Sequence, residues 1–178
     1  MSDTLGLVTL GPAAYYPIGK LKEKLSERLR DFRVQILRPL DSPTMAFDSF
    51  RKQYHSTRIL AILEEYAETV ETEYVLGITS ADLYIPGNYF VFGEARCPGR
   101  VAVISTFRLR THRSDQSGLF ESRVVKEAVH ETGHMMGLEH CPSASCVMCF
   151  SEQVVDTDRK REDFCSECES KLEWVEVE

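Results

Sequence analysis

Three histidines and one glutamate fall within a short stretch of this sequence. His130, Glu131 and His134 form the pattern His-Glu-x-x-His, and His140 follows shortly after. Two histidines four positions apart share one face of a helix, so both imidazoles can reach a single metal ion. Glu131 lies beside that face, where its carboxylate can meet a metal-bound water but is poorly placed to bind the ion as well. This pattern is typical of a hydrolytic zinc site.

The residues after His134 extend the match to His-Glu-x-x-His-x-x-Gly-x-x-His. Gly137 can adopt the positive φ that ends a helix, which would swing His140 back toward the metal. We therefore predict a catalytic zinc on three ligands: His130, His134 and His140. Glu131 is the predicted general base of the reaction.

Five of the six cysteines lie between residues 141 and 168. In a reducing compartment such clustering favours a metal site over disulfides. Spacing alone selects two Cys-x-x-Cys pairs, Cys146 with Cys149 and Cys165 with Cys168, as ligands of a structural zinc. Four thiolates on one ion would tie the segment after Gly137 to the end of the chain.

The stretch 130–140 resembles the zinc signature of the metzincin proteases, and Met148 resembles the methionine of their Met-turn. Within that clan the placing of Cys141, Cys146 and the pair Cys165-x-x-Cys168 is similar to the archaemetzincins. The resemblance implies two zinc ions per chain, one catalytic and one structural. It also implies that Met148 forms an apolar floor beneath the histidines and does not bind the ion.

The resemblance and the spacing differ on one ligand of the structural zinc. The archaemetzincin pattern leaves Cys149 aside, and we adopt that pattern while keeping Cys149 as the substitute. The adopted ligands are Cys141, Cys146, Cys165 and Cys168.

Upstream of the histidines, short apolar runs alternate with amphipathic stretches, which predicts a right-handed, mostly parallel sheet with helices packed on it. The expected strands and helices are strands over 5–10, 33–37 and 74–79, a helix opening at Pro17, and a helix over 59–70 capped by Ser56 or Thr57.

The middle of the chain departs from this rhythm. Two β-rich runs, 88–93 and 101–107, follow one another with no helix between them, which predicts an antiparallel edge strand. An exposed edge can accept an extended peptide, so we expect substrate to dock at 88–93. Helical patterns return over 119–136, which carries the first two histidines, and over 158–172.

The length of 178 residues fits one domain. We expect a sheet-and-helix part at 1–137 and a zinc-stapled C-terminal part at 138–178. A net charge of −7 offers no positive field for nucleic acid or anionic lipid. The N-terminus lacks a secretory pattern, and no apolar run reaches the roughly 18 residues that a membrane span needs. We therefore expect a cytoplasmic monomer with a peptide substrate and with no nucleic-acid or membrane partner.

The sequence thus predicts an α/β (α+β) metallopeptidase of metzincin type, a zinc hydrolase that cleaves peptide bonds through a zinc-bound water activated by Glu131. An alternative is a noncatalytic, zinc-stabilised binding module whose histidine site is degenerate or weakly metallated. The intact set of Glu131 and three histidines argues against the alternative. The natural substrate, the choice between aminopeptidase and endopeptidase, and the side chain that stabilises the oxyanion are left open.

Overall fold

A five-stranded sheet forms the centre of the molecule, which a computed structural model describes over residues 3–11, 16–111 and 118–175. The first four strands in spatial order are parallel, and the last is antiparallel to its neighbour. This confirms the mostly parallel sheet with an antiparallel edge. In spatial order the strands are β2 (Phe32–Ile36), β1 (Asp3–Leu10), β5 (Tyr74–Thr79), β8 (Val101–Ser105) and β7 (Gly93–Ala95).

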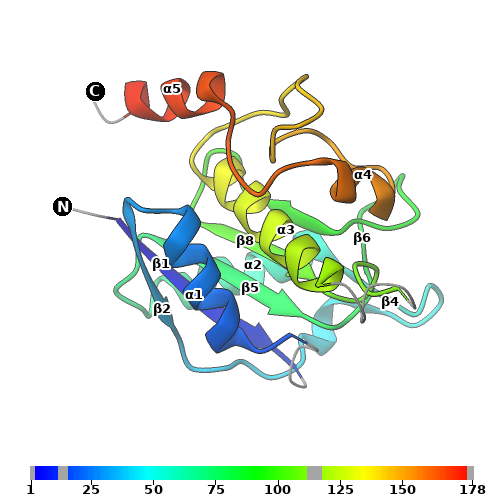
Figure 1. Cartoon of the computed structure of the whole chain (residues 1–178). Coiled ribbons are helices and arrows are strands. Elements are labelled where there is room, and N and C mark those ends of the chain that lie inside the picture. The colour runs from blue at the N-terminus through cyan, green and yellow to red at the C-terminus, as the bar shows by residue number, and fades with distance from the viewer. Residues whose placement is uncertain (1–2, 12–15, 112–117, 176–178) are drawn as a thin grey trace.

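Helices cover both faces of this sheet (Figure 1). Helices α1 (Ile18–Arg28) and α3 (Leu119–Met135) lie on one face, and α2 (Ser56–Ala67) lies on the other. Side chains of a strand alternate between the two faces. In β5, Ile78 accordingly packs in the cluster with α1 and α3, whereas Val75 packs in the cluster with α2. Burial on both faces explains why the parallel strands read as continuous apolar runs.

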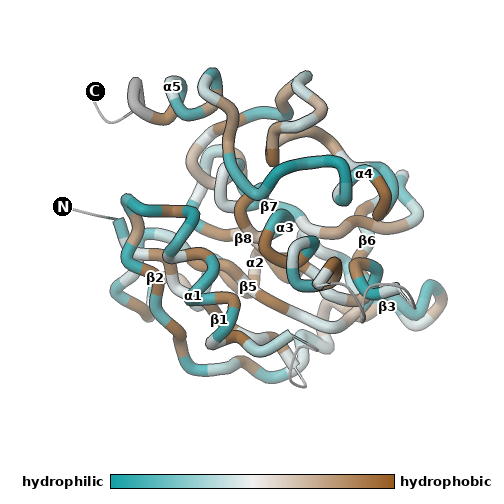
Figure 2. The backbone as a smooth tube through the Cα atoms, viewed as in Figure 1, coloured by the Kyte–Doolittle hydropathy of each residue, from teal (hydrophilic) through white to brown (hydrophobic). Residues whose placement is uncertain are grey.

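Smaller elements surround the sheet. A second sheet contains three short strands, and two short helices follow α3. The hydropathy of the residues differs between these parts. The central strands contain apolar stretches, whereas the segment between the last two helices is strongly polar (Figure 2). These elements are η1 (Thr44–Ala46), β3 (Phe47–Asp48), β4 (Gln53–His55), β6 (Leu83–Tyr84), α4 (Val154–Arg159) and α5 (Ser166–Val175). None of the helices in the described part of the chain is both long and apolar enough for a membrane span.

The edge strand is shorter and begins later than predicted, since only Gly93 of the expected run 88–93 belongs to β7. The residues before Gly93 have other partners: the Arg51 guanidinium donates to the carbonyl oxygens of Asn88 and Tyr89, and Val91 pairs with Leu83 of β6. A side chain from a distant segment therefore occupies acceptors that a strand would use.

The predicted cap of α2 is wrong. The helix begins at Ser56, and no side chain caps it. The hydroxyl groups of Ser56 and Thr57 both donate to the carboxylate of Glu94 on β7. These two residues thus tie α2 to the edge strand.

The single C-terminal helix predicted over 158–172 is also wrong, because α4 ends at Arg159 and α5 starts at Ser166. Between them the backbone pairs with another segment. The Arg161 amide donates to the carbonyl of Ser145, and the carbonyl of Asp163 accepts from the Val147 amide. These pairings replace the hydrogen bonds that a continuous helix would need.

Candidate metal centres

Helix α3 presents its two histidines with their rings fixed by backbone carbonyls. His130 Nδ1 lies 2.8 Å from the carbonyl oxygen of Val147, and His134 Nδ1 lies 2.6 Å from that of Leu138. A carbonyl oxygen can only accept, so each Nδ1 must carry the proton and donate it. Each neutral ring then has an unprotonated Nε2.

These two Nε2 atoms lie 3.1 Å apart. Two lone pairs at that separation repel unless a cation lies between them. Burial, the main cause, holds the pKa of His130 well below its ordinary value and also lowers the pKa of His134, so a protonated ring does not supply that charge. Two nitrogens on one tetrahedral zinc, at about 2.0 Å each, would lie about 3.3 Å apart. The pair therefore fits a zinc ion.

The third histidine reaches the same place through the end of α3. Gly137 has φ of 92°, as the sequence predicts, and its amide donates to the His134 carbonyl while the Leu138 amide donates to that of Gly133. The turn brings the His140 ring centroid to 4.8 Å from that of His134. The ligand atoms of all three histidines lie within 4.8 Å of one another. His140 is exposed, so the cluster faces solvent on its side.

Glu131 lies beside this cluster with only 3% of its surface exposed. Its Oε2 atom is buried without a hydrogen-bond partner, and the carboxyl group of Glu127, one helical turn earlier, lies close to it. Burial and the nearby Glu127 raise the pKa of Glu131 well above its ordinary value. A Cβ added to Gly93 would come within 2.6 Å of Glu131 Oε1, so the backbone of β7 lies directly against this carboxylate. A buried oxygen without a partner is costly, which fits a group prepared for a ligand.

Met148 packs against α3 at Gly133. It is fully buried, and a Cβ at Gly133 would overlap its sulfur and its Cε atom. The same Cβ would come within 2.9 Å of the Phe164 ring. The helix can therefore approach this methionine only because position 133 has no side chain.

We expect the substitution Gly133→Ala to destabilise the fold by about 1–3 kcal/mol, the usual cost of an extra methyl group in a packed core. Thermal unfolding measures the change. The matched control is Gly19→Ala in α1, where a Cβ meets nothing within 4 Å and alanine favours the helix. Equal melting temperatures for the two variants would show that Met148 does not pack as described.

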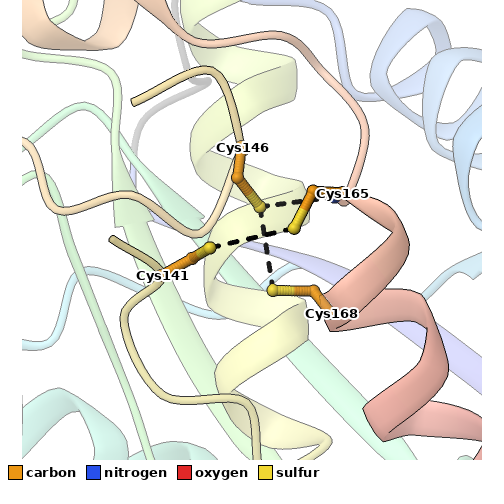
Figure 3. A group of neighbouring side chains, drawn as sticks. All are labelled: Cys141, Cys146, Cys165 and Cys168. Atoms are coloured by element: carbon orange, nitrogen blue, oxygen red, sulfur yellow. Dashed lines mark hydrogen bonds between the residues drawn. The ribbon is translucent and has the colours of Figure 1, made fainter. Parts of the chain in front are cut away.

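Four cysteines gather at a second place, between the loop after α3 and the start of α5 (Figure 3). The sulfur atoms of Cys141 and Cys165 lie 3.8 Å apart, as do those of Cys146 and Cys168. Four thiolates on a tetrahedral zinc at about 2.3 Å would be separated by about 3.8 Å. The donors thus fit a zinc ion, whereas a disulfide would need about 2.05 Å.

Backbone amides stabilise negative charge on two of the sulfurs, those of Cys146 and Cys165. The backbone amide of Cys165 donates to Cys146 Sγ, and the amide of Cys168 lowers the pKa of the Cys165 thiol to about 7. Thiolate is the form that binds metal. Cys149 lies among the described residues, but its sulfur is outside the group of four.

Two residues outside the predicted site lie next to the histidines. Glu127 precedes Glu131 by four positions, a helical spacing that could have revealed the pair. Lys160 is buried close to both carboxyl groups, but it stands in a run of charged residues that resembles an exposed segment.

Known proteins resemble the chain over most of its length. A family model described as peptidase family M54 matches residues 26–174. The archaemetzincin of Methanopyrus kandleri is 42% identical over 156 residues, covering 88% of this chain and 86% of the relative. That of Archaeoglobus fulgidus is 47% identical over 141 residues, covering 79% and 82%.

Solved structures agree with these sequences. The crystal structure of archaemetzincin from Methanopyrus kandleri has a TM-score of 0.84 at 38% identity and covers 97% of this chain and 95% of its own. That of archaemetzincin from Archaeoglobus fulgidus, complexed with malonate, has a TM-score of 0.82 at 40% identity and covers 94% and 99%. The agreement extends over both the sheet and the C-terminal segment.

Proposed function

The chain belongs to peptidase family M54, the archaemetzincin family, and we propose that it hydrolyses peptide bonds by the zinc chemistry of the metzincin type. One observation carries the proposal. Two unprotonated imidazole nitrogens face each other at 3.1 Å, next to a buried glutamate oxygen that has no partner. This combination supplies metal ligands and a base at one place, which a binding module does not require.

We assign two zinc ions to each chain. The catalytic ion would be held by His130, His134 and His140, which leaves a fourth position open because three protein ligands are typical of catalytic zinc. The structural ion would be held by Cys141, Cys146, Cys165 and Cys168, a closed set of four thiolates. Met148 would support the first site by packing under α3.

The zinc ion and the side chains would have separate roles in the reaction. Zinc, when bound, polarises the substrate carbonyl and lowers the pKa of water. Glu131 accepts a proton from the attacking water at its carboxylate and delivers that proton to the leaving amine. The neighbouring Glu127 carboxyl group limits the movement of the Glu131 carboxyl group on one side, and the backbone at Gly93 limits it on the other.

The substrate that suits this arrangement is an extended peptide. Strand β7 lies at the edge of the central sheet, so one side of its backbone can pair with an added strand. The same strand lies against Glu131, which would bring a docked peptide to the reacting groups. We propose β7, in place of the run 88–92, as the docking edge.

A digestion of a mixed-sequence peptide library tests the proposed function. Protein loaded with zinc should cleave a subset of the peptides, treatment with a chelator should reduce cleavage to background, and added zinc should restore it. The positions of the cuts distinguish aminopeptidase from endopeptidase action. If fully metallated protein leaves every peptide of the library intact, the noncatalytic binding module becomes the better explanation.

A further inference from the structure

Lys160 is buried, although both residues that flank it are exposed arginines. Its surface is 5% exposed. It directly follows α4, where the backbone becomes extended with φ −76° and ψ 157°. This extended residue turns its side chain inward, toward α3.

The Lys160 ammonium ends at a carbonyl that also orients a histidine. Nζ donates to the carbonyl oxygen of Val147 at 3.1 Å, and the same oxygen accepts the His130 Nδ1 proton at 2.8 Å. A carbonyl oxygen has two lone pairs and can serve both donors. One acceptor therefore links the lysine to a proposed zinc ligand.

Charge explains why the lysine is tolerated there. Glu127 and Glu131 are 4% and 3% exposed, and Lys160 attracts both carboxyl groups. An isolated buried ammonium would be very costly, and a buried carboxyl pair would also need compensation. Burial lowers the pKa of Lys160, and Glu127 is the main group that opposes this change. The lysine and the two acids thus compensate one another beneath the histidines.

We propose that Lys160 is a positioning residue of the histidine site, which fixes the Val147 carbonyl and through it the orientation of the His130 ring. The proposal rests on the proposed zinc site. Loss of the group that hydrogen-bonds a metal-binding histidine typically lowers metal affinity 10- to 100-fold, and Lys160 would act by holding that group, the Val147 carbonyl, in place.

The chain contains a matched control for this inference. Lys126 on α3 is 7% exposed, and its Nζ donates to the carbonyl of Thr157 at 3.1 Å. Like Lys160, it is a buried lysine whose ammonium ends on a backbone carbonyl of the C-terminal segment. Its acceptor does not orient a histidine, so it shares the structural role without the proposed positioning role.

The experiment compares Lys160→Met with Lys126→Met. Zinc affinity of the histidine site is measured by competition with a chelator, and Co²⁺ substitution reports the two sites separately because only thiolate ligands give intense sulfur-to-metal absorption. We expect about 10- to 100-fold weaker zinc binding at the histidines in Lys160→Met, with the thiolate absorption retained. Lys126→Met should keep the parental affinity even if its melting temperature falls equally.

Equal affinities in the two variants would overturn the positioning role. Lys160→Arg keeps the charge and the donor, so it should recover affinity to within about threefold of the parent, well inside the loss expected for an absent positioning group. If Lys160→Met does not fold, Lys160→Gln replaces it, because its shorter polar side chain does not reach the Val147 carbonyl; parental zinc affinity in that variant would overturn the positioning role. A parent protein that binds no metal at its histidines would instead reject the proposed function.

Discussion

Replacement of Glu131 by glutamine should lower kcat for peptide hydrolysis by about 10²–10⁴, the usual contribution of a general acid–base group. Glutamine has nearly the same shape, but its amide cannot take a proton from water. The zinc content should remain unchanged, because Glu131 is not among the three histidine ligands that we propose. The measurement pairs kcat on a cleaved library peptide with metal analysis of the same sample.

Glu139→Gln is the matched control for this variant. Glu139 is an exposed acid within the same histidine signature, and its replacement by glutamine removes the same charge from the chain. We expect its kcat to stay close to that of the parent. A Glu131→Gln protein with full zinc and parental kcat would refute the role of Glu131 as the base.

Local patterns explain what could be predicted. The strands and helices of the sheet follow from apolar periodicity, and both faces of the sheet are buried by helices close in sequence. The end of α3 depends on one residue, Gly137, whose positive φ a glycine adopts without strain. The position of the histidines was therefore predictable, since it requires one helix and one turn.

Contacts between distant segments determine the features that could not be predicted from the sequence. Residues ahead of β7 bond to Arg51 and to Leu83, and the hydroxyl groups of Ser56 and Thr57 donate to Glu94 and do not cap α2. The burial of Lys160 depends on a carbonyl in another loop. No periodic pattern in the sequence predicts these pairings.

The choice among cysteines shows the same limit. Spacing favours Cys149, because it forms a Cys-x-x-Cys pair with Cys146. In the fold, the Cys141 amide donates to the Met148 carbonyl, so the loop closes and carries Cys141 to the other sulfurs. The family resemblance selected Cys141, which spacing alone did not.

Three consecutive residues connect the two proposed zinc sites. Cys146 belongs to the sulfur group, the Val147 carbonyl accepts from His130, and Met148 packs against α3. An ion on the cysteines would therefore hold the segment that orients a ligand of the other ion. In this proposal the structural site would support the catalytic site through residues 146–148.

This connection makes Cys141→Ser the second variant with a large expected effect. Serine does not supply a thiolate, so the cysteine site should lose its ion, and structural zinc sites contribute about 10–16 kcal/mol of apparent binding free energy in small zinc-finger peptides. We expect zinc content to fall from two ions per chain to one or fewer, with a clearly lower melting temperature.

Cys149→Ser provides the comparison, because it alters the other candidate thiol eight residues along the same loop. It should retain both ions and the parental melting temperature, since its sulfur lies outside the group of four. The reverse result, with zinc lost from Cys149→Ser and kept in Cys141→Ser, would assign the structural ion to the ligands that spacing selects. Peptide hydrolysis should follow zinc retention, because the segment at 146–148 orients His130 only while the cysteine site holds it in place.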